Sequence, residues 1–321
     1  VLVDLFGWRS IFFMVVPFCL ASLWLAYKFV PKTAPGGVAA VRGSGLDARG
    51  LALGTVGTLC LLNGLVALRG DSPLQAGLLL AGALLAFGIF VWWQRRLAAS
   101  GGTPLMNLAL FQYRQFAMGS VVAFIYGTAL FGSTYLLPVY MQVGLHLSAS
   151  HVGTILLPAG IVLALTIAGV GRLADRHPTW VLVTIGLALL AASFALMMVL
   201  RLDSALWLLV AFAIIGRIGL GFILPSLNLG SMRPLAKPLI PQGASAINFL
   251  RMLGGAAGVS LCAIVLEWRL AAHGDSLANP MSSPARLAAF DEVFAMLAGL
   301  CALAICAAWQ LRQSDPARVS T

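Results

Sequence analysis

Residues 205–227 read ALWLLVAFAIIGRIGLGFILPSL, a continuous apolar run with one charged side chain, Arg217, near its middle. At about 1.5 Å per residue, a helix of this length reaches about 34 Å, enough to cross the roughly 30 Å hydrocarbon core of a bilayer. The run is apolar on every face and lacks the alternation of a β-barrel strand. Because backbone groups in lipid must be satisfied within their own segment, this stretch predicts a transmembrane helix.

The rest of the chain has the same character. Of its 321 residues, 60% are hydrophobic and 9% are charged, and the mean hydropathy is +0.97. A soluble domain carries about 25% charged residues, so the sequence predicts an all-α integral membrane protein. Its nine predicted transmembrane helices are Ile11–Val30, Leu51–Leu68, Leu74–Trp93, Phe116–Met141, Val152–Gly171, Trp180–Leu200, Ala205–Leu227, Ala244–Leu266 and Ala288–Leu311.

The predicted loops differ in positive charge. Of the 20 Lys and Arg residues, 13 lie on the side of the C-terminus and five on the other side, while Arg217 and Arg251 lie inside spans. Positively charged loops mark the cytoplasmic side, so we expect the C-terminus inside and Val1 outside. The chain begins with Val1 rather than Met, and we expect it to begin within a longer protein rather than at a signal peptide.

Several functional classes fit the sequence poorly. The net charge of +10 is spread in ones and twos between apolar runs, which argues against nucleic-acid binding. The five cysteines lie in apolar runs without C-x-x-C spacing, and the four histidines are scattered in loops. We therefore predict no metal and no cofactor. An intramembrane enzyme needs titratable groups converging at one depth, so an enzyme or an assembly scaffold is the least favoured alternative.

Arg217 is the most informative single residue. A charged side chain at the bilayer centre costs roughly 2.5–3.5 kcal/mol on insertion scales, and the midplane is too deep for easy snorkelling. Two interpretations are open: Arg217 faces a water-filled cavity or gate, or it forms a structural pair with another charge. Arg251 lies about 10 Å into its span, from where it either lines the pathway or snorkels to the cytoplasmic interface.

Further polar and aromatic residues in or near the spans are candidates for lining a substrate pathway, because aromatic faces hold apolar or cationic ligands. They are Tyr126, Tyr135, Tyr140, Gln142, Asn228 and Asn248. Tyr140 and Gln142 also fit the aromatic belt at the outer interface. Gly254-x-x-x-Gly258 lets two helix backbones approach closely, which suits static packing as well as helices that slide during transport.

The acidic residues show a different pattern. None of the ten lies in the middle of a predicted span. Proton relays in membranes normally use a buried carboxylate or histidine. We therefore expect any proton-coupling group to lie outside this sequence.

One loop carries a motif. The segment Gly171-Arg-Leu-Ala-Asp-Arg176 separates two spans on the predicted cytoplasmic side. One interpretation is a helix terminus, with Asp175 complementing the dipole of the helix that follows. The other is a cytoplasmic latch of Gly171, Leu173, Asp175 and Arg176, whose charges exchange partners as the helices move.

This loop resembles the G-x-L-x-D-R signature of the major facilitator superfamily and, within it, of the 14-helix drug:proton antiporters of the EmrB/QacA type. Other segments follow in the order of that family: Trp8-Arg9-Ser10-Ile11-Phe12, Tyr135-Leu-Leu-Pro-Val-Tyr-Met-Gln142, Arg217-Ile-Gly-Leu-Gly221 and Asn248-Phe-Leu-Arg-Met-Leu-Gly-Gly255. The chain departs from the signature where Pro178, Thr179 and Trp180 stand in place of glycine and two basic residues.

The resemblance implies that the nine spans are helices six to fourteen and that about the first five are absent. It assigns residues 1–30 to the last helix of an N-terminal six-helix bundle. Residues 31–115 become cytoplasmic linkers and two extra transmembrane helices, and residues 116–321 a C-terminal six-helix bundle. We expect such a fragment not to transport by itself, because half of the central site would be missing.

The resemblance also implies an activity. The expected function is secondary active transport: proton-coupled efflux of small amphipathic or drug-like compounds by alternating access, in the bacterial cytoplasmic (inner) membrane. An exporter of a siderophore or metabolite with the same fold is the alternative. The implied partners are the lipid bilayer, a small-molecule substrate and protons, and a periplasmic adaptor is a further candidate partner.

Overall fold

The computed structural model describes residues 7, 9–30, 47–70, 72–201, 204–277 and 283–312. Within these ranges every regular element is a helix, and nine helices are long and apolar enough to cross a membrane, which confirms the predicted fold class. They are α2 (Ser10–Phe29), α3 (Ala48–Ala67), α4 (Pro73–Ala99), α5 (Arg114–Val139), α6 (Ala149–Ala174), α7 (Thr179–Met197), α8 (Leu206–Met232), α9 (Ile240–Ala272) and α10 (Pro284–Trp309). The 3-10 turns η2 (Leu108–Gln112) and η4 (Lys237–Leu239) precede α5 and α9, and the π turn η3 (Tyr140–Gly144) continues α5.

Some helices extend well beyond the predicted spans. The helix α4 continues to Ala99 instead of ending at Trp93, and α9 runs over Ile240–Ala272 instead of Ala244–Leu266. Hydropathy identifies only the part of a helix that lies in the hydrocarbon core. The helix itself continues beyond that core as long as the following residues favour helical conformation. Glutamine and arginine, which follow Trp93 in α4, are good helix formers.

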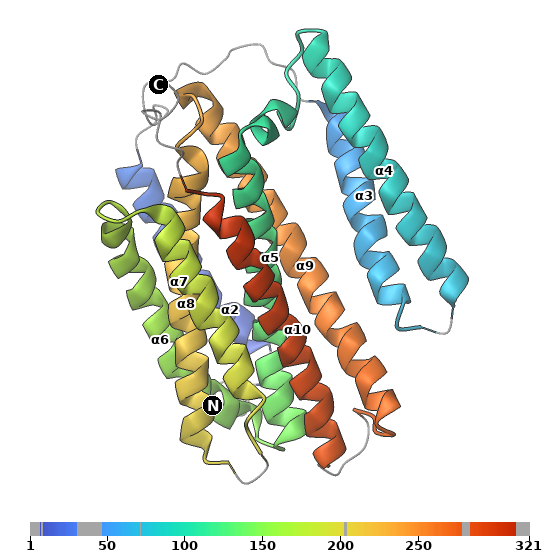
Figure 1. Ribbon diagram of the computed structural model, residues 1–321, viewed down its shortest axis with the longest axis vertical. Helices are drawn as coiled ribbons and strands as arrows, with labels where there is room; N and C mark the ends of the chain where they lie inside the picture. Colours follow the sequence, from blue (N-terminus) through green and yellow to red (C-terminus); the bar gives the residue numbers. More distant parts are fainter. Residues whose placement is uncertain are drawn as a thin grey trace, which may run out of the picture.

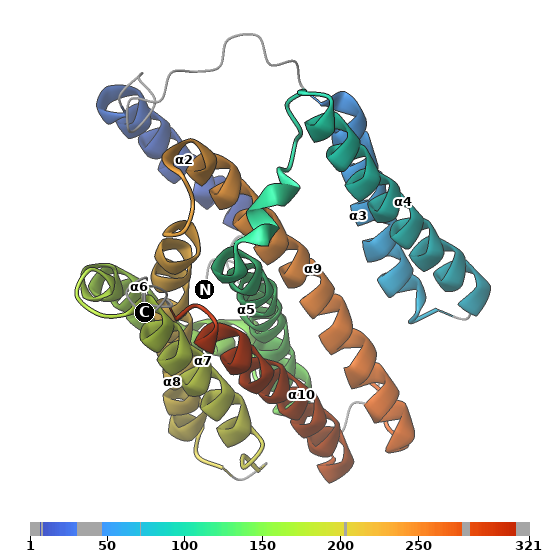
Figure 2. The ribbon, with the colours of Figure 1, turned by 45° about the horizontal axis from the view of Figure 1, so that its top comes forward.

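The helices α5 to α10 pack into one bundle. The main contacts join α5 to α9, α7 to α8, α6 to α8, and α10 to both α5 and α7 (Figure 1). The helices α3 and α4 form a hairpin beside α9, outside the bundle (Figure 2). The helix α2 has exposed side chains from Phe12 to Val30, so it adds nothing to the bundle core.

The two ends of the bundle differ in charge. At one end, toward the top of Figure 1, α3, α5, α7 and α9 begin and α4, α6, α8 and α10 finish; we call it the basic end. Its described basic residues are Arg49, Arg95, Arg96, Arg114, Arg172, Arg176, Arg233, Lys237 and Arg312. The opposite end of the bundle and hairpin carries Arg69, Arg201, Arg269 and Arg286. The alternation agrees with the predicted threading, and the cytoplasmic position of the basic end stays a prediction.

A hydrogen-bond cluster holds the hairpin together at the basic end. Asp47 caps α3: its Oδ1 accepts from the backbone N–H of Gly50 at 2.8 Å and from the Trp93 indole at 2.9 Å, and its Oδ2 accepts from Gln94 at 2.6 Å. Gln94 in turn accepts from the backbone N–H of Met106 at 3.1 Å. Burial by itself would raise the pKa of Asp47, but the hydrogen bonds outweigh it and hold that pKa below its ordinary value of 3.8.

At the opposite end an ion pair joins the hairpin to the bundle. Arg69 follows α3, and its Nε donates to Glu267 Oε2 of α9 at 2.8 Å. The hairpin is therefore tied within itself at the basic end and to α9 at the other end.

Candidate functional site

Glycines on α8 place Arg217 inside the bundle. A Cβ at Gly216 would lie 2.6 Å from Ser193 Oγ of α7, and one at Gly219 would lie 2.6 Å from the Gly186 carbonyl oxygen. The backbone of α8 therefore rests directly against α7. Beside this contact, Arg217 borders a cavity of about 10 Å³ lined by residues of α5, α7 and α8, room for roughly one water molecule.

Arg217 has no carboxylate within salt-bridge distance among the described residues. Of the two interpretations open from the sequence, the cavity is present but small, and the structural pair is not found within the described ranges. A guanidinium at this depth without a counter-charge attracts an anionic or hydrogen-bond-accepting group.

A second glycine contact brings α5 and α9 together. A Cβ at Gly127 would lie 1.9 Å from the carbonyl oxygen of Arg251, and one at Gly254 would lie 2.1 Å from that of Phe124. Thr128 Oγ1 donates to the Gly254 carbonyl oxygen at 2.9 Å. The close approach predicted from Gly254-x-x-x-Gly258 is therefore confirmed, with α5 as the partner helix.

This contact brings polar groups of three helices near one another, close to the middle of each helix. The phenol of Tyr126, almost fully buried on α5, lies within electrostatic range of the guanidinium groups of Arg251 and Arg217. Arg251 also donates from Nη2 to Asn248 Oδ1 at 2.6 Å. At 1.5 Å per residue, Tyr126, Arg251 and Arg217 lie about 18, 16 and 22 Å from the basic ends of α5, α9 and α8. We call Tyr126, Arg217, Arg251 and Asn248 the mid-depth cluster.

The remaining predicted pathway residues lie elsewhere. Tyr140 is buried and makes edge-to-face contacts with Phe290 at 5.3 Å and Phe294 at 5.9 Å between ring centroids, so it belongs to the packed core rather than an aromatic belt. Tyr135 is near the Arg69–Glu267 pair at the opposite end. Gln142 and Asn228 are exposed. The structure therefore brings together four of the eight predicted residues.

The loop motif lies on the surface of the basic end. Asp175 is the C-terminal cap of α6, whereas α7 begins at Thr179 after the cap Pro178. Asp175 thus lies four residues before the start of α7, and its contact with the dipole of that helix stays a prediction. Gly171, Asp175 and Arg176 are exposed and Leu173 is half-buried, and no ion pair involves either charged residue within the described chain.

The sequence missed a buried ion pair at the opposite end. Arg286, at the start of α10, is completely buried and donates to both carboxylate oxygens of Asp275, at 3.1 and 3.2 Å, and to the carbonyl oxygen of Val143 at 3.1 Å. It thereby joins the start of α10 and Asp275, just after α9, to the π turn η3 that follows α5. The one sequence signal near this ion pair is Ser283-Pro284, which is typical of the start of a helix. The described residues hold no group of His, Cys, Asp and Glu arranged for a metal.

Comparison with known proteins identifies the fold. Residues 1–259 match the family model described as Major Facilitator Superfamily. The chain belongs to this superfamily. Among its relatives, a lincomycin resistance protein of Listeria monocytogenes is 28% identical over 269 residues, covering 81% of this chain and 54% of the relative. A multidrug resistance protein B homolog of Mycobacterium tuberculosis is 28% identical over 309 residues, covering 90% and 54%.

Membership in the superfamily agrees with the nine apolar helices of the described residues. An uncharacterised transporter of the superfamily from Bacillus subtilis, YhcA, is 26% identical over 301 residues, which cover 92% of this chain and 55% of the relative. The chain thus spans about half the length of the curated relatives it matches.

Proposed function

We propose that this chain is part of a proton-driven exporter of small amphipathic compounds. The observation that carries the proposal is the mid-depth cluster, where Tyr126, Arg251 and Arg217 place polar groups near the middle of α5, α9 and α8. Transporters of this architecture bind substrate near the bilayer midplane. The printed names of the lincomycin and multidrug resistance relatives support export of drug-like compounds.

The proposed domain plan has three parts. Residues 1–30 belong to an N-terminal bundle, residues 31–115 to linkers and the extra hairpin α3–α4, and residues 116–321 to the C-terminal bundle. The exposed surface of α2, the mutual packing of α5–α10 and the half-length match to relatives support this plan and the 14-helix type. The charge of the basic end supports a cytoplasmic C-terminus in a bacterial inner membrane.

Alternating access is the proposed mechanism. Glycine contacts bring the backbones of α5 and α9, and of α7 and α8, close together. Transporters built from repeated bundles work by moving one bundle of such closely packed helices against the other. The segment Gly171–Arg176, which is the last turn of α6 and the two residues after it, is placed to serve as a latch at the basic end, and the proton-coupling carboxylate belongs to a part of the transporter outside this chain. A periplasmic adaptor stays a candidate partner of the complete transporter.

A metabolite exporter is the second candidate. The mid-depth cluster holds two guanidinium groups and, within the described residues, no paired carboxylate. This charge favours a substrate that carries a carboxylate or another acceptor group, as many metabolites do.

Dye accumulation tests the proposed function. The full-length protein is expressed in efflux-deficient cells, and ethidium accumulation is followed with and without a protonophore. We expect full-length protein to lower accumulation, the protonophore to restore it, and this chain by itself to have no effect. Unchanged accumulation with full-length protein would exclude ethidium export; efflux by this chain alone would refute the domain plan.

A matched pair of probes separates the two candidates. Dansylcadaverine ends in an ammonium group and dansyl-aminohexanoate in a carboxylate, while the fluorophore is the same. Efflux of the cationic probe supports the drug exporter. Efflux of the anionic probe alone, abolished by Arg217→Gln, supports the metabolite exporter.

A further inference from the structure

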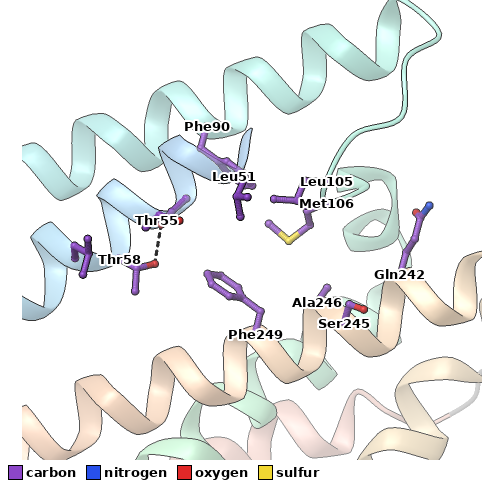
Figure 3. Close-up of a pocket in the computed structure, with 12 residues that line it drawn as sticks. Leu51, Thr55, Thr58, Phe90, Leu105, Met106, Gln242, Ser245, Ala246 and Phe249 are labelled. Atoms are coloured by element: carbon purple, nitrogen blue, oxygen red, sulfur yellow. Dashed lines mark hydrogen bonds between the residues drawn. The ribbon is translucent and has the colours of Figure 1, made fainter. Parts of the chain in front are cut away.

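A pocket separate from the mid-depth cluster lies between the hairpin and the bundle. Its volume is about 430 Å³, within the range of pockets that hold small ligands. Residues of α3 and α4 line one wall, residues of α9 line the other, and Leu105 and Met106 close it near the basic end (Figure 3). In this view the side chains of Met106 and Phe249 project into the space between α3 and α9.

Hydrogen bonds hold these walls in place. The backbone N–H of Met106 donates to Gln94 Oε1 of α4 at 3.1 Å, and Gln94 Nε2 donates to Asp47 Oδ2, just before α3, at 2.6 Å. Gln94 is almost completely buried, so this network is shielded from water. At the opposite end of the hairpin, Arg69 donates to Glu267 of α9. The pocket therefore has fixed walls, as sites that are formed before their ligand binds have.

The lining favours an aromatic ligand. Phe90 and Phe249 contribute rings from the two walls, and Met106 contributes a thioether. Aromatic rings attract other rings in edge-to-face or offset arrangements, and a thioether sulfur also packs favourably against a ring. Gly54 lines the pocket too, and a Cβ added to it would lie 3.8 Å from the Phe90 ring. The absence of a side chain at Gly54 thus leaves room beside this ring.

The lining also favours an uncharged ligand. None of the lining residues in the described parts of the chain is charged. Thr58 and Ser245 each donate a hydrogen bond to the carbonyl oxygen four residues earlier in their own helices, at 2.8 and 3.0 Å. A charged group would lose its hydration here without meeting a counter-charge, which is costly. An uncharged group with a single donor would still find the hydroxyl oxygens of Thr58 and Ser245 as acceptors.

The pocket opens toward lipid. Leu51, Leu59 and Phe249 line it and are nevertheless exposed. The two leucines belong to α3, which is long and apolar enough to cross a membrane, so the opening faces hydrocarbon. Uncharged aromatic compounds dissolve in hydrocarbon, whereas charged compounds are kept at its surface by the cost of losing their hydration. The opening and the lining therefore favour the same class of ligand.

We propose that this pocket is a binding site for uncharged aromatic compounds that enter it from the bilayer. The ligand packs its rings against Phe90, Phe249 and Met106 and directs its polar group toward Thr58 or Ser245. A lipid acyl chain is the competing occupant, and it lacks the rings that this lining favours. The pocket is separate from the mid-depth cluster, so the proposal does not depend on what the protein transports.

Photolabelling with benzophenone tests the proposal. Benzophenone is an uncharged aromatic ketone that attaches preferentially to methionine under near-ultraviolet light. The chain is placed in lipid nanodiscs, illuminated with increasing amounts of the probe, digested and analysed by mass spectrometry. We expect labelling of Met106 to saturate, and to fall at least fivefold when excess fluorenone, an uncharged aromatic competitor, is added. Labelling of Met14, which is exposed on α2, should rise in proportion to the probe and should not respond to fluorenone.

Matched variants locate the bound probe. Gly54→Leu fills the pocket and should lower Met106 labelling at least tenfold. Gly88→Leu puts the same side chain at an exposed position of α4, where nothing lies within 4 Å of an added Cβ, and should leave labelling unchanged. Phe249→Ala removes one ring without adding bulk, and should lower Met106 labelling roughly two- to tenfold because a ring–ring contact is lost.

Matched probes test the ligand class. Benzoylbenzoate and benzoylbenzyl-trimethylammonium carry the same photoreactive group with a negative or a positive charge. Labelling of Met106 is expressed relative to labelling of Met14, so that differences in how much probe enters the lipid cancel. On this scale each charged probe should label Met106 at least tenfold less than benzophenone does.

Three outcomes would overturn the proposal. Met106 labelling that stays proportional to the probe would show that lipid fills the pocket. Equal Met106 labelling in Gly54→Leu and Gly88→Leu would show that the probe binds elsewhere. Charged probes that label Met106 as strongly as benzophenone, relative to Met14, would refute an uncharged ligand. Because labelling requires no transport, each of these results leaves the proposed exporter untouched.

Discussion

The contact between α5 and α9 gives the sharpest prediction for a single methyl group. In Gly127→Ala, the new Cβ would lie 1.9 Å from the Arg251 carbonyl oxygen and 3.0 Å from the backbone nitrogen of Gly255. Both obstacles are backbone atoms, so no side chain can rotate away and the helices must separate. Overpacking of this kind costs about 1–3 kcal/mol.

Two further terms adjust this magnitude. Separation weakens the 2.9 Å bond from Thr128 to the Gly254 carbonyl oxygen, and bonds between membrane helices average about 0.6 kcal/mol. Alanine recovers up to about 1 kcal/mol through its higher helix propensity. We therefore expect Gly127→Ala to lower the free energy of unfolding by about 0.6–2.6 kcal/mol, and to separate Tyr126 from Arg251.

The assay is unfolding in mixed micelles, followed by circular dichroism. The matched control is Gly299→Ala on α10, an exposed position where nothing lies within 4 Å of the added Cβ, and it should be neutral or stabilising. If the two variants were equally stable, the backbone contact between α5 and α9 would be refuted.

Three other perturbations follow from the same contacts. Arg286→Met removes the cation that pairs with the buried Asp275 and should destabilise the protein by about 3–5 kcal/mol in the same unfolding assay. Arg269→Met breaks a half-exposed pair with Glu292 and should cost less than about 1 kcal/mol. Equal effects of the two substitutions would contradict the burial of Arg286. Asp47→Asn removes charge-assisted hydrogen bonds and should cost about 1–2 kcal/mol, against no effect for the exposed Asp175→Asn. Folding lowers the pKa of Asp47, so the stability that this carboxylate contributes is fully present above its ordinary pKa and is lost as the pH falls through and below 3.8. A loss of stability between about pH 5 and 8 that Asp47→Asn abolishes would contradict this sign.

The nine helices of the described residues were predictable because an apolar run of about 20 residues directly indicates a helix surrounded by lipid. The contact at Gly254 and Gly258 was predictable for a related reason: small residues four apart mark a face that admits another backbone. The partner helix was not, because Gly127 on α5 is 127 residues away in the chain from Gly254 and carries no motif of its own.

The site was predictable only in part. Arg217 stood out because a midplane charge is rare, but the grouping of Tyr126 with Arg251 depends on how α5 and α9 cross. Tyr140 looked like an interfacial aromatic because it lies near the end of a span, yet the π turn that follows α5 keeps it in the core. Arg286 was counted as a loop charge, since nothing in its spacing from Asp275 signals a buried pair.

We propose that the mid-depth cluster contacts the transported compound. It is tested most directly by the initial rate of probe efflux from cells expressing the full-length protein with Arg217→Gln, compared with Arg172→Gln, an exposed arginine of α6. We expect Arg217→Gln to lower the rate at least tenfold at equal expression and Arg172→Gln to leave it unchanged. Efflux by Arg217→Gln at the rate of the unaltered protein would contradict it.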